Sequence, residues 1–334
     1  MMPVWLSPGS ALVTLSLPQR YATMTVMRAS LVVNPVAGSR FRAGEIQKAI
    51  SYLRSSILDV NVEWTQGPGQ ATELARRAAD AGYDLVVACG GDGTISEVAN
   101  GLAGSGVPMG VLPTGTVNIW ATEAGIPRDL RKAARVLVDG VARPVDLGLA
   151  GSRYFLLMAG LGLDGAVARN LHLPMKRSLG RAAYVMAGMW TITGFEGARA
   201  DIRVDGQRLE RDVVWIVIGN TRLYGGHLSV TPDARVDDGL LDLCIFSGRS
   251  FFASAGGMIA LLGKRHLALK SVEYRQCREV TVESARPLPL QADGDYVGDT
   301  PQTFSVAPKA LQVMLPSGRR TCIFSETHSA GGAA

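Results

Sequence analysis

The chain has 334 residues, of which 47% are hydrophobic and 19% charged, and its formal net charge is +5 at pH 7. This length and apolar content can bury a full core divided between two domains, and they exclude an intrinsically disordered protein. The longest apolar runs, such as residues 213–219, fall well short of the roughly 20 residues that span a bilayer, so no transmembrane helix is expected. The basic residues are spread along the chain, so the charge indicates a lipid surface or nucleic acid only weakly.

The first 20 residues carry no positive charge before Arg20 and make a poor signal peptide. Met24 and Met27 stand just before the first predicted strand, so a translation start at either is left open. The four cysteines lack C-x-x-C spacing and are expected to be buried free thiols in a reducing cytosol. The four histidines show no spacing typical of a zinc site.

The first half alternates between strand-like and helix-like segments. Apolar runs typical of strands cover residues 28–33, 60–64, 85–89 and 107–112, and helical patterns cover 43–55, 70–81 and 95–102. Short connections between them predict βαβ units, and therefore an α/β domain with a parallel sheet. Ligands of such sheets bind at the carboxyl ends of the strands.

The segment Cys89-Gly90-Gly91-Asp92-Gly93-Thr94 joins the third strand to the next helix. Its glycines let the backbone adopt positive φ and approach a ligand closely, and the start of the helix favours phosphate. An acid in such a turn repels phosphate unless it binds magnesium or a hydroxyl group. Asp92 therefore predicts a nucleotide with its metal, and the alternative is an ordinary turn between a strand and a helix.

Two similar loops follow other strands of the same predicted sheet. They are Asn34-Pro35-Val36-Ala37-Gly38-Ser39 and Pro113-Thr114-Gly115-Thr116-Val117-Asn118. Both combine glycine with hydroxyl or amide side chains, which suits contacts to phosphate and ribose. Three such loops at one edge of a sheet arise by chance much less readily than one.

The second half has a different pattern. Strands are predicted over residues 153–159, 200–204, 213–220, 240–246, 271–274, 279–282 and 311–315, with a hairpin turn at Asp205-Gly206 and helix-like stretches over 180–194 and 251–263. We expect a mainly antiparallel domain, followed by a disordered tail over 325–334. Residues 160–165 match G-x-G-x-x-G, but no acid stands about 20 residues beyond, so we interpret them as a structural turn.

Two acidic segments stand out in this half. They are Asp237-Asp238-Gly239 and Asp293-Gly294-Asp295. Asp-Gly is common in surface hairpins, and that is one interpretation. Beside a phosphate-binding half, the same acids become candidates for binding magnesium and for accepting a proton from a substrate hydroxyl.

Taken together, these motifs resemble the lipid kinase family that includes bacterial diacylglycerol kinases, sphingosine kinases and ceramide kinases. The order and rough spacing agree from about residue 28 to 315, and Glu97, Asn100 and the Val145-Asp146-Leu147-Gly148 segment fit the same pattern. The G-G-D-G-T motif alone is less specific, since NAD kinases share it and phosphofructokinases have a similar one.

The resemblance implies an N-terminal α/β domain with a parallel sheet, like that of phosphofructokinase and NAD kinase, over residues 28–147, after an extension over 1–27. It implies a mainly antiparallel β-sandwich domain for lipid and metal over 148–324, with ATP in the cleft between the two. A structural magnesium would be held by the Asp238 carboxylate and the backbone carbonyls of Arg235 and Leu240. Asp295 would be the general base, with Asp92 as a second catalytic residue. The implied nucleotide contacts are Asn34, Pro35, Gly38, Thr65, Gly90, Gly91, Asp92, Gly93, Thr94, Glu97, Thr116 and Asn118.

The chain departs from the family pattern at several positions. The family base is usually Glu, whereas Asp295 is one methylene shorter. Ile119 and Trp120 stand where many bacterial relatives have Asp and Phe, and Ser39 stands where some have Lys. These changes bear on the identity of the substrate more than on nucleotide binding.

We therefore expect a cytoplasmic, ATP- and magnesium-dependent lipid kinase of phospholipid metabolism, with diacylglycerol as the default acceptor. The alternatives are an NAD kinase-like small-molecule kinase, which would not explain Asp238 and Asp295, and a catalytically silent nucleotide- or lipid-binding protein. Peripheral membrane contact is expected through Lys176, Arg177 and Arg181, unless these only form the solvated end of a packed helix. No nucleic acid partner is expected, and a homodimer is left open.

Overall fold

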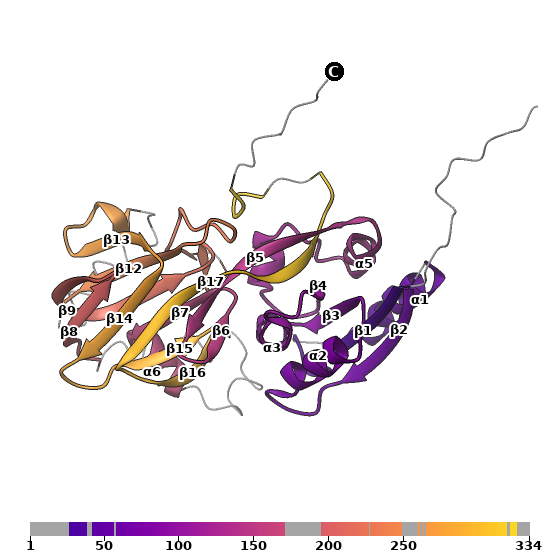
Figure 1. The fold of residues 1–334 in the computed structure, drawn as a ribbon, viewed down its shortest axis with the longest axis horizontal. Helices are drawn as coiled ribbons and strands as arrows, with labels where there is room; N and C mark the ends of the chain where they lie inside the picture. Colours follow the sequence, from indigo (N-terminus) through magenta and orange to yellow (C-terminus); the bar gives the residue numbers. More distant parts are fainter. Residues whose placement is uncertain are drawn as a thin grey trace, which may run out of the picture.

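The computed structural model describes residues 27–38, 42–56, 58–170, 195–226, 228–248, 260, 263, 265–318 and 321–325. The expected terminal extension and tail, the helices over 180–194 and 251–263, Ser39, and the basic residues Lys176, Arg177 and Arg181 lie wholly or almost wholly outside these ranges. Figure 1 shows two halves, an α/β half and a β-rich half, joined by two long strands. Among the described helices, none is long and apolar enough to cross a membrane.

The α/β half is a parallel sheet in the order β2-β1-β3-β4. Because chain direction across the sheet reverses after β2, right-handed crossovers place α1 on one face and α2 and α3 on the other. In Figure 1, α5 lies on the side of α1. The elements are β1 (Met27–Val33), α1 (Ala43–Ser55), β2 (Leu58–Trp64), α2 (Gln70–Asp80), β3 (Leu85–Gly90), α3 (Asp92–Leu102), β4 (Pro108–Pro113), α4 (Ile119–Glu123) and α5 (Leu130–Asp139).

Burial explains why this half could be predicted. Every residue of β3 is buried, as expected for a strand covered by helices on both faces, so it appears in the sequence as a continuous apolar run. Helix α1 buries Ile46, Ala49, Ile50 and Leu53, a spacing that places one apolar stripe on the sheet. The predicted α/β fold with a parallel sheet is confirmed.

The β-rich half is antiparallel in its pairings, as predicted. Asp205 and Gly206 form the expected two-residue hairpin turn, both at positive φ (46° and 82°). The elements are β5 (Val141–Ala150), β6 (Arg153–Phe155), β7 (Met158–Gly162), α6 (Leu163–Asn170), β8 (Ala198–Val204), β9 (Gln207–Gly219), β10 (Leu223–Tyr224), β11 (Leu228–Ser229), β12 (Leu241–Ser247), η2 (His266–Ala268), β13 (Val272–Cys277), β14 (Glu279–Ser284), β15 (Pro289–Ala292), β16 (Asp295–Asp299) and β17 (Gln302–Leu315).

Strands β5 and β17 connect the two halves into one continuous sheet. They pair with each other antiparallel along most of their length, and the start of β17 also pairs with β14. The end of β17 then adds to the parallel sheet, with Gln312 opposite Pro108 of β4. Figure 1 shows this ribbon running from one half into the other. Strand β5 contains the expected domain boundary near residue 148, and β17 extends from the β-rich half to the sheet of the α/β half.

The predicted strand over 153–159 is two strands, β6 and β7. They are interrupted at Leu156 and Leu157, whose N–H groups each donate to the side-chain carboxylate of Asp293 at 2.8 Å. These amides are therefore satisfied by a carboxylate instead of a neighbouring strand. An apolar run carries no sign of such a partner.

A buried carboxylate also fixes the two halves to each other. Glu123, at the end of α4, accepts the backbone N–H groups of Arg222 (3.0 Å) and Leu223 (2.8 Å). Its second oxygen accepts two N–H groups of the Arg222 guanidinium, at 3.2 and 2.9 Å. The Glu123 side chain is fully buried, so this carboxylate is shielded from water and salt, while the Arg222 side chain is 24% exposed.

We expect Glu123→Ala to lower the free energy of unfolding by about 3–5 kcal/mol, because it leaves the Arg222 charge and two backbone amides without their acceptor. A urea titration followed by fluorescence measures this. Glu73→Ala is the matched control, since it removes an exposed partner of Arg76 and should change stability by less than about 1 kcal/mol. Equal effects of the two substitutions would contradict this role of Glu123.

Candidate active site

The three glycine-containing loops meet at the carboxyl edge of the parallel sheet. A Cβ added to Gly38 would lie 2.5 Å from the carbonyl oxygen of Thr114, and one added to Gly115 would lie 2.4 Å from the Cα of Gly91. The Asn34 amide donates to the Thr94 hydroxyl at 2.9 Å and so connects the first loop to the start of α3. Only glycine permits this close backbone approach, so these residues are required by the packing of the loops themselves.

Asp92 is the first residue of α3, and its carboxylate faces the next helix. Oδ1 accepts the backbone N–H of Trp120 at 3.1 Å, in the first turn of α4. Burial raises the pKa of the Asp92 carboxyl above its usual value, while the N–H groups of Ile119, Trp120 and Asn118 oppose that rise. Asp92 therefore fixes α4 against the glycine turn, in addition to any contact with a nucleotide.

Glu97 holds a second helix in place. Its carboxylate accepts the N–H groups of Gly69 (2.9 Å) and Ala71 (3.0 Å), which satisfies donors at the start of α2. The Glu97 carbonyl oxygen accepts the Thr72 hydroxyl at 2.9 Å, so both the side chain and the backbone of Glu97 are bonded to α2.

The remaining predicted nucleotide contacts lie around the same edge. Thr65 follows β2, and its N–H donates to the Val33 carbonyl at 2.9 Å. The Thr116 carbonyl accepts from Arg128 at 2.6 Å. Asn118, at φ 55°, closes its own loop by donating to the Gly115 carbonyl at 2.7 Å and accepting the Gly115 N–H at 3.0 Å.

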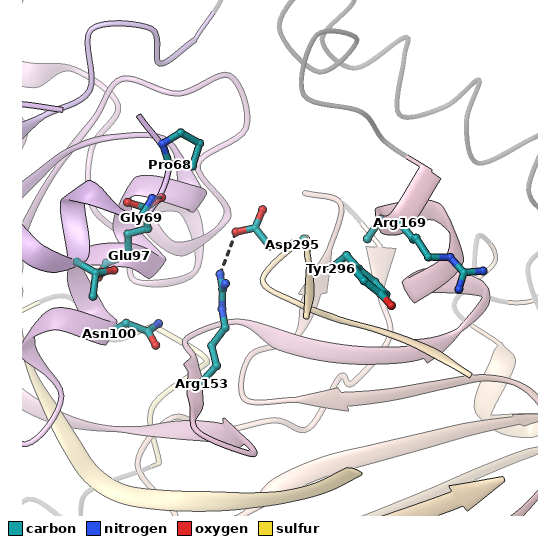
Figure 2. A pocket seen from close by; sticks show the side chains of 11 residues that line it. Pro68, Gly69, Glu97, Asn100, Arg153, Arg169, Asp295 and Tyr296 are labelled. Atoms are coloured by element: carbon teal, nitrogen blue, oxygen red, sulfur yellow. Dashed lines mark hydrogen bonds and ion pairs between the residues drawn. The ribbon is translucent and has the colours of Figure 1, made fainter. Parts of the chain in front are cut away.

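A cleft of about 430 Å³ opens between the two halves. Figure 2 shows Glu97 and Asn100 of the α/β half on one side, Arg169 and Tyr296 of the β-rich half on the other, and Asp295 between them. The lining residues are Pro68, Gly69, Thr72, Glu97, Asn100, Arg153, Ala168, Arg169, Gly294, Asp295 and Tyr296. Of the two predicted catalytic residues, Asp295 lines this cleft and Asp92 does not.

Asp295 forms an ion pair with Arg153, whose guanidinium lies 2.9 Å from Oδ2 (Figure 2). The Asp295 side chain is 44% exposed, so a substrate can reach it from the cleft. It follows a two-residue turn in which Asp293 (φ 50°) and Gly294 (φ 87°) both have positive φ, the geometry for which Asp-Gly is suited.

Asp293 is entirely occupied with structural contacts. Its carboxylate accepts the N–H groups of Leu156, Leu157 and Met158 at 2.8–3.1 Å and the Ser96 hydroxyl at 2.5 Å. Burial raises the pKa of this carboxyl, while those hydrogen bonds oppose the rise. Asp293 therefore anchors the turn, and Asp295 is left to face the cleft.

Two functional candidates, Arg153 and Arg169, were not identified from the sequence. Arg153 pairs with Asp295, and Arg169 also lines the cleft, where it lies 3.6 Å from Asp299. Asn100, noted only as part of the family pattern, exchanges two hydrogen bonds with the backbone of Tyr154 across the two halves, at 2.9 and 3.0 Å. An isolated arginine on a short strand or helix matches no motif, so only the fold places these cations beside Asp295.

The predicted magnesium ligands lie outside the cleft. Asp238 accepts the Leu240 N–H at 3.0 Å, and the carboxylates of Asp146 and Asp237 lie close enough to raise its pKa beyond the effect of desolvation. Arg235 donates its guanidinium to the carbonyls of Cys322 and Phe324. Within the described part of the chain, no three His, Cys, Asp or Glu side chains gather as a metal site. A cation fits here only through the Asp238 carboxylate with backbone carbonyls, an all-oxygen set of the kind magnesium prefers.

Comparison with known proteins places this geometry in a family. The family model described as the diacylglycerol kinase catalytic domain matches residues 28–150, and the model of the YegS C-terminal NAD kinase beta sandwich-like domain matches residues 158–315. The diacylglycerol kinase of Bacillus subtilis (strain 168) is 30% identical over 292 residues, covering 86% of this chain and 96% of that protein. The diacylglycerol kinase of Staphylococcus carnosus (strain TM300) is also 30% identical over 292 residues, covering 86% and 95%.

Solved structures agree with this assignment. A crystal structure of a diacylglycerol kinase from Bacillus anthracis str. Sterne superposes with a TM-score of 0.72 at 25% identity, covering 87% of this chain and 97% of that chain. The predicted order of an α/β domain followed by an antiparallel β-sandwich is thereby confirmed. The chain belongs to the diacylglycerol kinase family of lipid kinases.

Proposed function

We propose that the protein transfers the γ-phosphate of ATP to the hydroxyl group of a lipid, with diacylglycerol as the default acceptor. The observation that carries the proposal is Asp295, an accessible carboxylate in the cleft between the two halves, paired with Arg153. The curated relatives named as diacylglycerol kinases support this choice of acceptor.

The cleft suits phosphoryl transfer because it combines a proton acceptor with positive charge. In the proposed reaction the lipid hydroxyl oxygen attacks the γ-phosphorus, the bond to the β,γ-bridging oxygen breaks, and ADP leaves. The hydroxyl proton passes to Asp295, the first residue of β16 after the β15–β16 turn. Arg153 and Arg169 bring positive charge to the position where phosphate charge develops.

We propose that the nucleotide binds along the three loops at the sheet edge, through the contacts expected at Asn34, Thr65, Thr116 and the glycine turn. Helix α3 begins at that turn, so its first N–H groups and its dipole favour phosphate there. Magnesium bound with the nucleotide would neutralise phosphate charge. We also propose that residues 28–147 bind the nucleotide and that residues 148–324 bind the lipid. The protein would reach its lipid substrate by binding peripherally to the cytoplasmic face of a membrane.

Incubation of the purified protein with ATP and either a mixed lipid extract or NAD tests the function. Labelled phosphate should appear in a lipid product, and diacylglycerol vesicles should reproduce that product. Phosphorylation of NAD alone would support a small-molecule kinase, and no transfer to either acceptor would favour a silent nucleotide- or lipid-binding protein.

Asp295→Asn should reduce turnover about 10²- to 10⁴-fold, since it keeps the size of the side chain and removes the proton acceptor. ATP affinity should stay within a few-fold of the parent, because the nucleotide loops are unchanged. Asp295→Glu should keep substantial activity, because it restores the side chain common in the family. Initial rates and nucleotide titrations measure these effects.

The control for this series is Asp201→Asn, which neutralises another aspartate paired with an arginine, Arg208, on strands away from the cleft. It should turn over lipid like the parent. If Asp295→Asn does the same, the proton acceptor lies elsewhere in the cleft.

Asp238→Ala should lower the melting temperature and remove its dependence on added magnesium. The physical reason is mass action, because an ion bound only by the folded state stabilises that state. Thermal melts with increasing MgCl₂ measure the response, and Asp233→Asn, at an exposed acid of the same loop, is the control. A magnesium response equal to that of the parent would reject Asp238 as a ligand.

A further inference from the structure

The segment 160–165, which matches G-x-G-x-x-G, packs closely around the buried side chain of Asp164. A Cβ on Gly160 would lie 1.9 Å from Oδ2 of Asp164, and a Cβ on Gly165 would lie 1.9 Å from the Pro289 carbonyl oxygen. Gly162 has a φ of 82°, where other residues are strained. The three glycines therefore let Asp164 and the start of α6 lie directly against β15.

Asp164 is 2% exposed and has a donor at each carboxylate oxygen. The Gln291 side-chain amide of β15 donates to Oδ2 at 2.7 Å, and the Tyr224 hydroxyl donates to Oδ1. Asp164 also lies in the first turn of α6, where the helix dipole favours a negative charge.

The Gln291 side chain connects Asp164 to the turn that carries Asp295. While its amide nitrogen donates to Asp164, its oxygen accepts the N–H of Gly294 at 2.6 Å. Gln291 is itself 2% exposed, so water cannot substitute for either partner. The orientation of the Gln291 amide, and with it the position of Gly294, is thus set by the acceptor at Asp164.

The other partner of Asp164 leads back to the nucleotide half. Tyr224 directly follows Arg222 and Leu223, whose N–H groups hold Glu123 at the end of α4. The first turn of α4 is in turn held by Asp92 of the glycine turn. An unbroken series of contacts therefore joins the predicted nucleotide loop to the Asp295 turn.

We propose, resting on the kinase function above, that Asp164 is a positioning residue for phosphoryl transfer. Its carboxylate orients Gln291, which holds Gly294 so that Asp295 faces the cleft, and its bond to Tyr224 couples that turn to the nucleotide half. Asp164 does not touch the reacting atoms. Its effect therefore falls on turnover and leaves nucleotide affinity largely unchanged.

The hydrogen-bond pattern predicts which substitutions fail and which restore the turn. In Asp164→Asn, the side-chain oxygen still accepts from the Gln291 amide, and the new NH₂ group donates to the Tyr224 hydroxyl oxygen, so the link to the turn is kept. In Gln291→Glu, two carboxylates face each other. Asp164→Asn combined with Gln291→Glu exchanges donor and acceptor, so both the link between the side chains and the acceptor for Gly294 return.

The first experiment measures kcat and the KM for ATP in the two single variants and the double variant. Gln291→Glu should lose about 10- to 100-fold in kcat, the scale expected for a misplaced catalytic group. Asp164→Asn should stay within a few-fold of the parental kcat, and KM for ATP should stay within about threefold in both. The double variant should recover at least tenfold over Gln291→Glu. Parental kcat in Gln291→Glu, or a double variant no better than Gln291→Glu, would overturn the proposal.

The second experiment needs no lipid. Hydrogen exchange at the Gly294 amide should be faster in Gln291→Glu and return towards the parental rate in the double variant; unchanged exchange in Gln291→Glu would overturn the proposal. If the parent phosphorylates no lipid, the proposed function fails, while the exchange data still decide whether Asp164 holds the turn.

Tyr224→Phe provides a milder variant should a single substitution at 164 or 291 fail to fold. It removes only the hydroxyl that donates to Asp164, and kcat should fall several-fold. Tyr274→Phe is the matched control, because Tyr274 donates to buried Asp242 in a similar pair on β13, which the sheet order separates from β15 by β7, β9 and β12. Tyr274→Phe should keep parental kcat, and equal kcat values in the two variants would overturn the proposal.

Discussion

Burial of carboxylates against backbone N–H groups of a distant segment is the interaction on which this structure depends. Glu123 accepts the N–H groups of Arg222 and Leu223, and Asp293 accepts those of Leu156, Leu157 and Met158, at the start of β7 and just before it. A buried carboxylate deprived of such donors is strongly unfavourable, so each contact fixes two segments of chain in one relative position. The Glu123 contacts and the bond from the Ser96 hydroxyl to Asp293 cross between the two halves, so the cleft between them has a defined shape.

The same principle separates the acids that build the site from the acid that is available for chemistry. Asp92, Glu97 and Asp293 each accept backbone N–H groups, and those bonds hold α4, α2 and the β15–β16 turn. Asp295 instead faces an arginine side chain from an accessible position in the cleft. A side-chain partner can rearrange when a phosphate enters, whereas a backbone partner cannot do so without moving a helix or strand.

The sequence predicted those features that depend on neighbouring residues and missed those that depend on contacts between residues far apart in the chain. Buried strands such as β3 and amphipathic helices such as α1 are set by local apolar patterns, and their bounds agree with the prediction to within a residue or two. The break between β6 and β7 depends on Asp293, more than 130 residues away. Short α4 has too few residues to show a periodicity. The pairing of Arg153 with Asp295 likewise exists only after folding, because neither residue belongs to a motif that contains the other.

Strand β17 has a consequence for how the protein is made. The edge of β4 in the α/β half is covered by residues 312 and 313, which are translated about 200 residues after β4. Until β17 is made, this edge, which includes Met109, has no neighbour on that side, and an uncovered strand edge is prone to pair with other chains. The nascent α/β half therefore completes its sheet only after β17 has left the ribosome, which ties its folding to the synthesis of the β-rich half.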